Sequence, residues 1–390
     1  LAGRAVLLLA VLAVLVWRNP ASRRQAERGA ELEFRVAELS GALKSLAEQA
    51  QGSQINLPIV TPILFAAIHE PYVRGRYRLG DVQLYVNRGV GMSGVRVRVN
   101  GNERSTNFIS STRVTAEIPA SDIATSALVR ISVVLPGGSV SNETMLTVAR
   151  ATAHVSAASF SSTSFAPESI VACFGTNMAT GSDSSNKVPL PTVLAGTRMI
   201  VRDSANVARE APLFFVSPGQ INYLVPAGTA SGTATVTITA SDGVISGGQI
   251  EITQTAAGLF TANANGSGVP SAFLIRVGAG GAQTFEQIAR FDTATNSYVP
   301  LPINLGPASD QVFLILYGTG VRNRASLGSV TCSVGGTPVA VGFASAQGDL
   351  VGLDQINLDP LPRSLAGRGN VNLILTVEGR AANTVQVSVN

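Results

Sequence analysis

Three short blocks occur twice, in the same order, in the C-terminal part of this chain. Phe174-Gly175-Thr176 aligns with Tyr317-Gly318-Thr319, and Gln220-Ile221-Asn222 aligns with Gln355-Ile356-Asn357. A third block pairs GTATVTIT with GNVNLILT. Recurrence in a fixed order indicates that one structural unit has been duplicated. The sequence therefore predicts two similar β-sandwiches, at residues 151–257 and 258–390.

Strand and turn signals dominate after residue 55. The chain has 39 glycines and 19 prolines, with 45% hydrophobic and 13% charged residues, a composition typical of β-sandwiches joined by tight turns. Val95, Val97 and Val99 alternate with arginines, and Asn100-Gly101 then predicts a two-residue hairpin turn. Further strands are expected at 113–118, 128–135 and 145–148.

The first 20 residues differ from the rest of the chain. An apolar run of 13 residues from Ala5 to Trp17 lies between Arg4 and Arg18, whereas a membrane-spanning helix needs about 20 residues. No small-residue cleavage site follows, so we expect an uncleaved segment. The arginines after the run conflict with display of the downstream domains outside the cytoplasm. We therefore expect a hydrophobic helix that contacts a membrane or packs against copies of itself. Its anchoring or assembly residues are Leu7, Leu8, Val11, Leu12 and Leu15.

Residues 21–52 carry a heptad pattern. Apolar residues recur at spacings of 4, 3, 4, 3 and 4, from Leu32 to Ala50, which predicts a helical stalk that seeks a partner. The alternative is a helix that lies on the chain's own domains. Prolines at 58 and 62 then indicate an extended linker at 53–62. The expected packing residues of the stalk are Leu32, Val36, Leu39, Leu43 and Leu46.

Residues 63–150 combine alternation with turn motifs, in an extended proline-containing opening followed by VRVRVNG, TRVTAEIPAS and VLPGGSVSNETMLTV. In these motifs the segment resembles the IPT/TIG family of immunoglobulin-like domains. The resemblance implies a small β-sandwich that acts as a spacer or protein-interaction module.

Residues 155–390 contain the motifs APESIVACFGTNMA, APLFFVSPGQINYLVPAGTASGTATVTI, SDQVFLILYGTGVRNR and GLDQINLDPLP. In these motifs the segment resembles the uncharacterised Solibacter-type C-terminal domain family of acidobacterial secreted proteins. The resemblance implies a non-enzymatic module outside the cytoplasm. With the N-terminal segments, the predicted fold class is mostly β: a long N-terminal α-helix followed by three immunoglobulin-like β-sandwich units, the last two an internal repeat.

Few residues point to catalysis or to a metal site. His69 and His154 are the only histidines, and no HExxH, GxSxG or GxxxxGK motif is present. We therefore expect no enzyme activity, no cofactor and no metal, with both histidines in loop or interdomain positions. Calcium binding by loops is an alternative to turn capping for four aspartates. These are Asp183, Asp349, Asp354 and Asp359.

The cysteines and the recurring amides also favour structural roles. Cys173 and Cys332 fall in different predicted domains, so buried free thiols are expected, with one disulfide as the alternative. The Gln and Asn of the repeated blocks are expected to hydrogen-bond a loop backbone. The net charge is +4, but lysine occurs only at Lys44 and Lys187 and the arginines are dispersed. We expect no nucleic-acid binding.

These patterns predict a non-catalytic structural protein of the bacterial cell surface, displayed or polymerised into a pilus-like filament through its N-terminal helix. The resemblance to pilin helices is partial, because Ala5 stands where a glutamate is expected. The alternative is a membrane-tethered adhesin or a carbohydrate- or protein-binding module of unidentified ligand. That alternative requires clustered exposed aromatic residues, yet aromatic residues make up only 5% of the chain and Trp17 is the only tryptophan.

Overall fold

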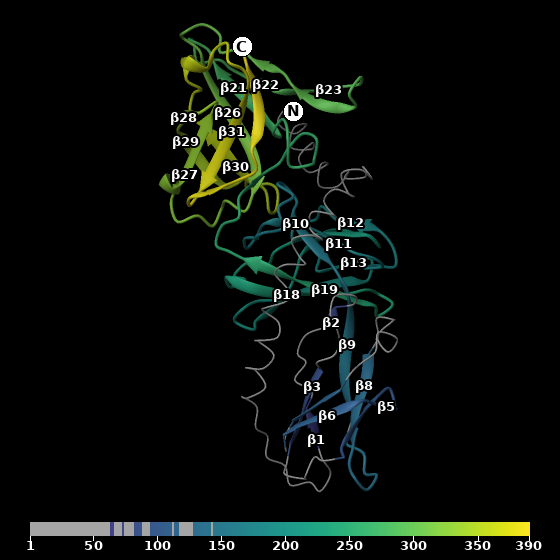
Figure 1. Ribbon diagram of the computed structural model, residues 1–390. Coiled ribbons are helices and arrows are strands. Elements are labelled where there is room, and N and C mark those ends of the chain that lie inside the picture. Colours follow the sequence, from purple (N-terminus) through teal and green to yellow (C-terminus); the bar gives the residue numbers. More distant parts are fainter. Residues whose placement is uncertain are drawn as a thin grey trace.

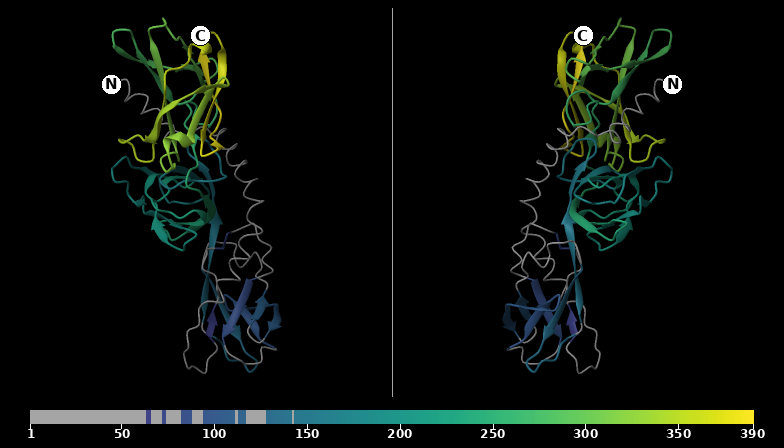
Figure 2. Two further views of the ribbon diagram at one scale, coloured as in Figure 1. Left: turned by 90° about the vertical axis from the view of Figure 1, so that its left-hand side faces the viewer. Right: turned by 90° about the vertical axis from the view of Figure 1, so that its right-hand side faces the viewer.

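Strands stacked in successive sheets along one long axis make up the described part of the chain (Figures 1 and 2). The structure is a computed structural model. It describes residues 63–65, 72–73, 82–87, 94–110, 113–116, 128–141 and 143–390.

Two sheets form the first sandwich, which lies at the lower end of Figure 1. One sheet has the order β1-β3-β7-β6, and the other contains β9-β8-β4-β5. Asn100 and Gly101 have φ values of 49° and 83°, so the hairpin turn predicted between β4 and β5 is confirmed. The strands are β1 (Ile63–Phe65), β2 (Tyr72–Val73), β3 (Val82–Asn87), β4 (Arg96–Val99), β5 (Asn102–Arg104), β6 (Thr106–Ser110), β7 (Arg113–Ala116), β8 (Leu128–Val134) and β9 (Thr144–Ala151).

The second sandwich packs the sheet β10-β11-β17-β16-β12 against β13-β14-β18-β19. Alternating residues of β14 and β18, including Met199, Val201 and Val236, are buried between the sheets because successive side chains of a strand point to opposite faces. Its strands are β10 (Ala153–Ser156), β11 (Ile170–Phe174), β12 (Asp183–Ser184), β13 (Val193–Leu194), β14 (Thr197–Arg202), β15 (Ala208–Glu210), β16 (Leu213–Val216), β17 (Gln220–Leu224), β18 (Gly232–Thr239) and β19 (Ile245–Ile252).

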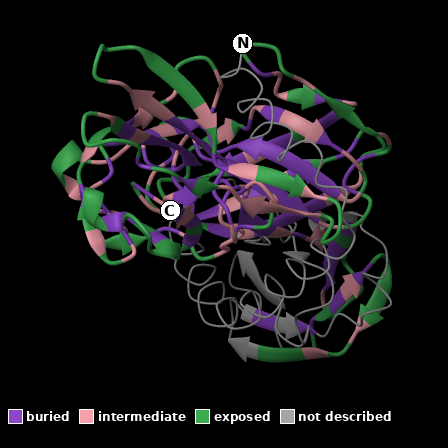
Figure 3. Ribbon diagram, turned by 90° about the horizontal axis from the view of Figure 1, so that it is seen from above, coloured by how far each residue is buried: buried purple, intermediate pink, exposed green. Residues whose placement is uncertain are grey.

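The third sandwich packs β22-β21-β26-β30-β29 against β25-β33-β31-β27-β28, and the hairpin β23-β24 projects from it (Figure 1). Figure 3 shows the buried residues between the sheets and the exposed ones on hairpins and loops. Its strands are β20 (Gly258–Leu259), β21 (Ala272–Val277), β22 (Gln283–Gln287), β23 (Ala289–Asp292), β24 (Ser297–Pro300), β25 (Pro302–Ile303), β26 (Gln311–Thr319), β27 (Val330–Val334), β28 (Thr337–Val339), β29 (Val341–Ala346), β30 (Asp354–Leu358), β31 (Gly369–Val377), β32 (Arg380–Ala381) and β33 (Val385–Val389).

The repeated blocks occupy equivalent strand pairs in the second and third sandwiches. β11 pairs with β17 so that Phe174 lies opposite Gln220, and β26 pairs with β30 so that Tyr317 lies opposite Gln355. The next strand in each sheet, β16 or β29, pairs through a bulge. The recurrence in the sequence therefore corresponds to a recurrence of strand register.

The first two sandwiches share one sheet. β9 pairs with β8 of the first sandwich, and its last residues pair in parallel with β19 of the second, Arg150 opposite Ser246 and Ala151 opposite Gly247. Backbone hydrogen bonds thus continue across the boundary between the sandwiches. A shared ladder resists bending between them far better than a flexible linker does.

The fold class is corrected to all-β. In the described residues the only helical segments are the 3-10 turns η2 (Leu327–Ser329) and η3 (Arg363–Leu365), so the predicted long N-terminal helix is not supported. Its residues, 1–52, and the linker 53–62 lie outside the described residues. A periodic pattern of three heptads is marginal for helix formation on its own. No helix among the described residues has the length and hydropathy of a membrane span.

Candidate functional site

A buried polar cluster surrounds His154 in the second sandwich. Nε2 of His154 lies 3.0 Å from Thr152 Oγ1 and 3.9 Å from Cys173 Sγ, and Nδ1 lies 3.2 Å from the Tyr223 hydroxyl. The rings of His154 and Tyr223 meet edge to face, with centroids 5.8 Å apart. His154 is therefore part of a strand and of the core, not the loop or interdomain residue that the sequence led us to expect.

Burial keeps the members of this cluster uncharged. It lowers the pKa of His154 to about 3 and raises the pKa values of Cys173 and Tyr223. A nucleophilic cysteine needs a lowered pKa and an imidazole that can carry a proton. The cluster therefore has the electrostatics of a satisfied core network. His69 lies outside the described residues.

A second polar cluster joins the second and third sandwiches. The Asp354 carboxylate is fully buried, and it accepts hydrogen bonds from Arg322 Nε at 2.7 Å and from the Val321 backbone N–H at 2.7 Å. Arg322 also lies 3.7 Å from Glu168 of the second sandwich. Burial raises the pKa of Asp354, whereas Arg322 opposes this effect. In the first repeat, Gly219 stands at the position of Asp354. The carboxylate is therefore not a feature that the two repeats share, and we assign it to the junction.

Thr319 extends this junction. Its hydroxyl accepts a hydrogen bond from the Ile170 backbone N–H at 3.0 Å and donates one to the Gly352 carbonyl at 2.8 Å. Asn323 Nδ2 donates to the Pro167 carbonyl at 2.8 Å. Around these bonds, residues of both sandwiches form one buried apolar cluster. It contains Ala158, Ile170, Leu224, Phe260, Phe273, Ile315, Tyr317 and Leu353.

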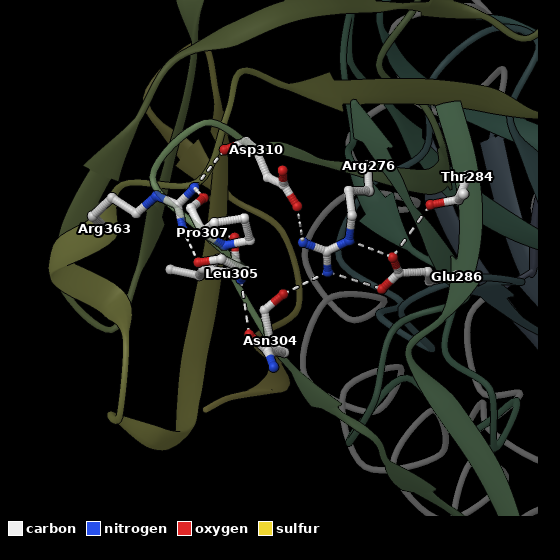
Figure 4. A network of polar contacts seen from close by, with 9 residues as sticks. Arg276, Thr284, Glu286, Asn304, Leu305, Pro307, Asp310 and Arg363 are labelled. Carbon is white, nitrogen blue, oxygen red and sulfur yellow. Dashed lines mark hydrogen bonds and ion pairs between the residues drawn. The ribbon is translucent and has the colours of Figure 1, made fainter. Parts of the chain in front are cut away.

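An arginine network holds the edge strand β22 and the loop before β26 (Figure 4). Arg276 on β21 binds both carboxylate oxygens of Glu286 on β22, at 2.6 and 3.1 Å, and lies 3.4 Å from Asp310. This pairing raises the pKa of Arg276 and lowers that of Glu286. Arg363 donates to the carbonyls of four loop residues, Leu305, Gly306, Pro307 and Asp310. The Arg276–Glu286 pair thus holds β22 against β21, and Arg363 holds the loop before β26.

Aromatic side chains gather on the opposite face of that sheet. Phe285 on β22 is 54% exposed, and its ring lies 5.7 Å from that of Phe273 on β21, which in turn lies 6.2 Å from Tyr317 on β26. The sequence did not predict such a cluster, because the chain is poor in aromatic residues. The register of three strands, which no local pattern reveals, brings these rings together.

Other residues singled out in the sequence lie apart from one another. Asp354 is buried in the junction, whereas Asp183, Asp349 and Asp359 are exposed, and the described residues contain no cluster of acids, histidines or cysteines suited to a metal ion. The prediction of two buried free thiols is confirmed. The repeated amides bond each other: Gln220 donates to Asn222, and Gln355 to Asn357.

The ten N-terminal residues proposed for anchoring and stalk packing lie outside the described residues. The anchoring residues were Leu7, Leu8, Val11, Leu12 and Leu15. The stalk residues were Leu32, Val36, Leu39, Leu43 and Leu46. Lys44 lies in the same stretch, and Lys187 is exposed in a loop.

No family model matches the sequence, and no curated protein matches it. Among solved structures, one match is SGBP-B of the Bacteroides ovatus mixed-linkage glucan utilization locus, in complex with a mixed-linkage heptasaccharide. It is 12% identical in sequence, and the match covers 87% of this chain and 68% of SGBP-B, with a TM-score of 0.28. The plexin A4 extracellular region is 10% identical over 86% of this chain and 35% of its own, with a TM-score of 0.19. Dpr2 Ig1-Ig2 in complex with DIP-Theta Ig1-Ig3 is 5% identical over 84% and 99%, with a TM-score of 0.17.

Proposed function

We propose that this chain is a non-catalytic structural protein of the cell surface in which three β-sandwiches form a rigid rod. The observation that carries the proposal is that both boundaries between sandwiches are held by specific contacts. β9 and β19 share a ladder at the first boundary. At the second, Ile170 and Leu224 pack with Phe273 and Tyr317.

Rigidity distinguishes this proposal from a string of independent modules. Interfaces between domains of one chain are commonly polar and permit relative motion. Here the second boundary is apolar, and it adds a buried Asp354–Arg322 pair and the Thr319 hydrogen bonds. A rod of fixed shape suits a spacer that holds a surface at a set distance. The family resemblances of the sequence support a position outside the cytoplasm.

Solution scattering of the full chain tests the rod. We expect one rigid shape to fit the data, and we expect Thr319→Val, which removes hydrogen bonds on both sides of the junction, to broaden the distribution of interatomic distances. Thr331→Val, at an exposed position of β27, is the matched control and should scatter like the unaltered chain. Unaltered protein that requires an ensemble of bent shapes would contradict the proposal.

The surface location requires a separate experiment. An antibody raised against residues 143–390 should label intact source cells. Labelling only after the cells are broken would contradict the location and leave the rigidity of the rod as a separate result.

A further inference from the structure

One face of the sheet β22-β21-β26-β30-β29 in the third sandwich carries a surface of aromatic, aliphatic and amide side chains. In antiparallel strands, residues directly opposite each other share a face. Phe285 on β22 lies opposite Ile275 on β21, which lies opposite Phe313 on β26. We call these three residues the aromatic row. The neighbouring row on the same face contains Gln287, Phe273, Ile315, Asn357 and Phe343.

This face is only partly covered. The second sandwich packs on Phe273, Ile315 and Tyr317, all of which are buried. Ile275 and Phe313 pack against the edge of that cluster and are half-buried, whereas Phe285 is 54% and Phe343 39% exposed. The aromatic row therefore continues the established interface out to the free edge of the sheet.

The two rows and their margin carry amides in place of charges. Gln283, Gln287 and Gln311 are exposed at its margin, and Gln355 and Asn357 are half-buried beside the aromatic residues. The charged residues of β21 and β22, Arg276 and Glu286, alternate with the aromatic row and so point to the other face, where they neutralise each other (Figure 4). No charged side chain belongs to the two rows described above.

This combination selects among ligand classes. The two rows carry no charge, and Asp359, whose carboxylate lies against Gly342 beside Phe343, is acidic. The face therefore offers no electrostatic attraction for nucleic acid or acidic polymers. Energetic centres of protein interfaces are enriched in Trp, Tyr and Arg, and the exposed part of this face offers phenylalanine and glutamine. Aromatic rings provide apolar stacking surfaces, and surrounding amides can hydrogen-bond hydroxyl groups. A neutral sugar polymer presents both complementary groups: apolar ring faces and hydroxyls at the rim.

The geometry also suits an extended polymer. Neighbouring strands are about 4.8 Å apart, so the aromatic row spans about 10 Å across three strands. Contact between Phe273 and Phe285, tilted by 45°, restrains the exposed ring, and the Arg276–Glu286 pair fixes the strand that carries it. Restrained rings lose little entropy on binding.

We propose that the aromatic row of the third sandwich, centred on Phe285, is a binding site for a neutral polysaccharide. The proposal does not depend on the rigid-rod function, because it concerns the surface of one sandwich.

Affinity electrophoresis of the full chain in gels containing hydroxyethyl cellulose, soluble starch or galactomannan tests the site. We expect at least one of these neutral polymers to retard the chain. Phe285→Ala should weaken that retardation by about tenfold or more, the effect of losing a central aromatic contact. Phe108→Ala is the matched control, because Phe108 is 52% exposed on β6 of the first sandwich. It should leave the retardation unchanged.

Three results would overturn the proposal: no retardation by any of the three neutral polymers, retardation only by the acidic polymers heparin and polygalacturonate, or equal loss in Phe285→Ala and Phe108→Ala. Self-association of the chain that Phe285→Ala abolishes, without sugar binding, would assign the face to a contact between copies instead. An unchanged unfolding temperature for Phe285→Ala shows that the variant is folded.

Discussion

At the scale of single residues, the buried carboxylate of Asp203 is stable because it has hydrogen-bond and ion-pair partners. Asp203 shows the balance of effects. Burial of its fully covered side chain raises its pKa. The backbone N–H groups of Ala230 and Val207 and the Arg209 guanidinium lower the pKa by more than burial raises it, so that the net value is about 2. The charged carboxylate thereby closes a loop that connects three segments of the second sandwich.

Asp203→Asn should destabilise the second sandwich at neutral pH. An aspartate has a pKa of about 4 when unfolded, so the unfolded state binds more protons between pH 4 and pH 2. The contribution of the ionised Asp203 carboxylate to the free energy of unfolding is therefore complete above about pH 4, and it is lost as the pH falls towards 2. The variant should lose about 2 to 3 kcal/mol in urea unfolding at pH 7, with less loss at pH 2.5. Asp183→Asn, at an exposed position, should unfold like the unaltered chain.

His154 should remain neutral throughout the physiological range. Its pKa of about 3 in the folded state lies below the unfolded value of about 6.5. The unfolded state therefore binds the extra proton first, and stability falls as the pH drops from about 6.5 towards 3. In an NMR titration, the ring signals of His154, assigned with a His69→Gln variant, should not shift between pH 8 and pH 5. A transition with a midpoint near 6.5 would contradict the buried network.

At the scale of secondary-structure elements, the edge strand β22 depends on a side-chain contact. An edge strand has one neighbour only, and here the bidentate Arg276–Glu286 pair adds to the ladder with β21. The same strand carries Phe285 on its other face. The position of the aromatic row thus depends on an ion pair on the opposite side of the sheet.

Glu286→Gln should loosen β22 without unfolding the sandwich. The neutral amide cannot replace two charge-assisted hydrogen bonds, so backbone amides of β22 should exchange with solvent about tenfold faster. Amides of β31 in the other sheet should be unaffected. Because the pKa of Glu286 is lowered in the folded state, acidification below its ordinary range should reproduce the effect in the unaltered chain. Glu251→Gln, exposed on β19, serves as control, and equal exchange in both variants would refute the role of the pair.

At the scale of the whole molecule, close approach at one glycine couples the second and third sandwiches. Gly352 has a φ of 77°, and a Cβ there would lie 2.5 Å from Ile170 Cγ1 and 2.7 Å from Leu224 Cδ1. Both neighbours belong to the other sandwich and to the junction cluster. Only glycine permits this contact.

Gly352→Ala should therefore separate the unfolding of the two sandwiches. Gly348→Ala is a matched control, because Gly348 also has a positive φ, of 103°, but open space around it. Both variants introduce backbone strain of about 1 kcal/mol or more, and only the first introduces a clash. We expect calorimetry to show two transitions for Gly352→Ala and a single shared transition for Gly348→Ala. Two transitions in both variants would mean that strain alone uncouples the junction.

Several features of the fold follow from local patterns. Alternation at residues 95–99, followed by Asn100-Gly101, predicted a hairpin that the structure contains, because turn geometry and strand periodicity depend on neighbouring residues. The heptad pattern at residues 21–52 was equally local. It led us to expect a long N-terminal helix, whereas the described residues form an all-β fold. A local heptad pattern is weak evidence because most helical stability in proteins comes from tertiary packing.

The sequence by itself determined the strands, the tight turns and the recurrence of the Gln-Ile-Asn block, since these depend on residues close together in the chain. Only the tertiary structure decided that Thr319 would meet Ile170, that His154 would lie in the core, and that Phe285, Ile275 and Phe313 would share one face. The register between distant strands determines these contacts, and a shift of one residue would turn every side chain to the opposite face.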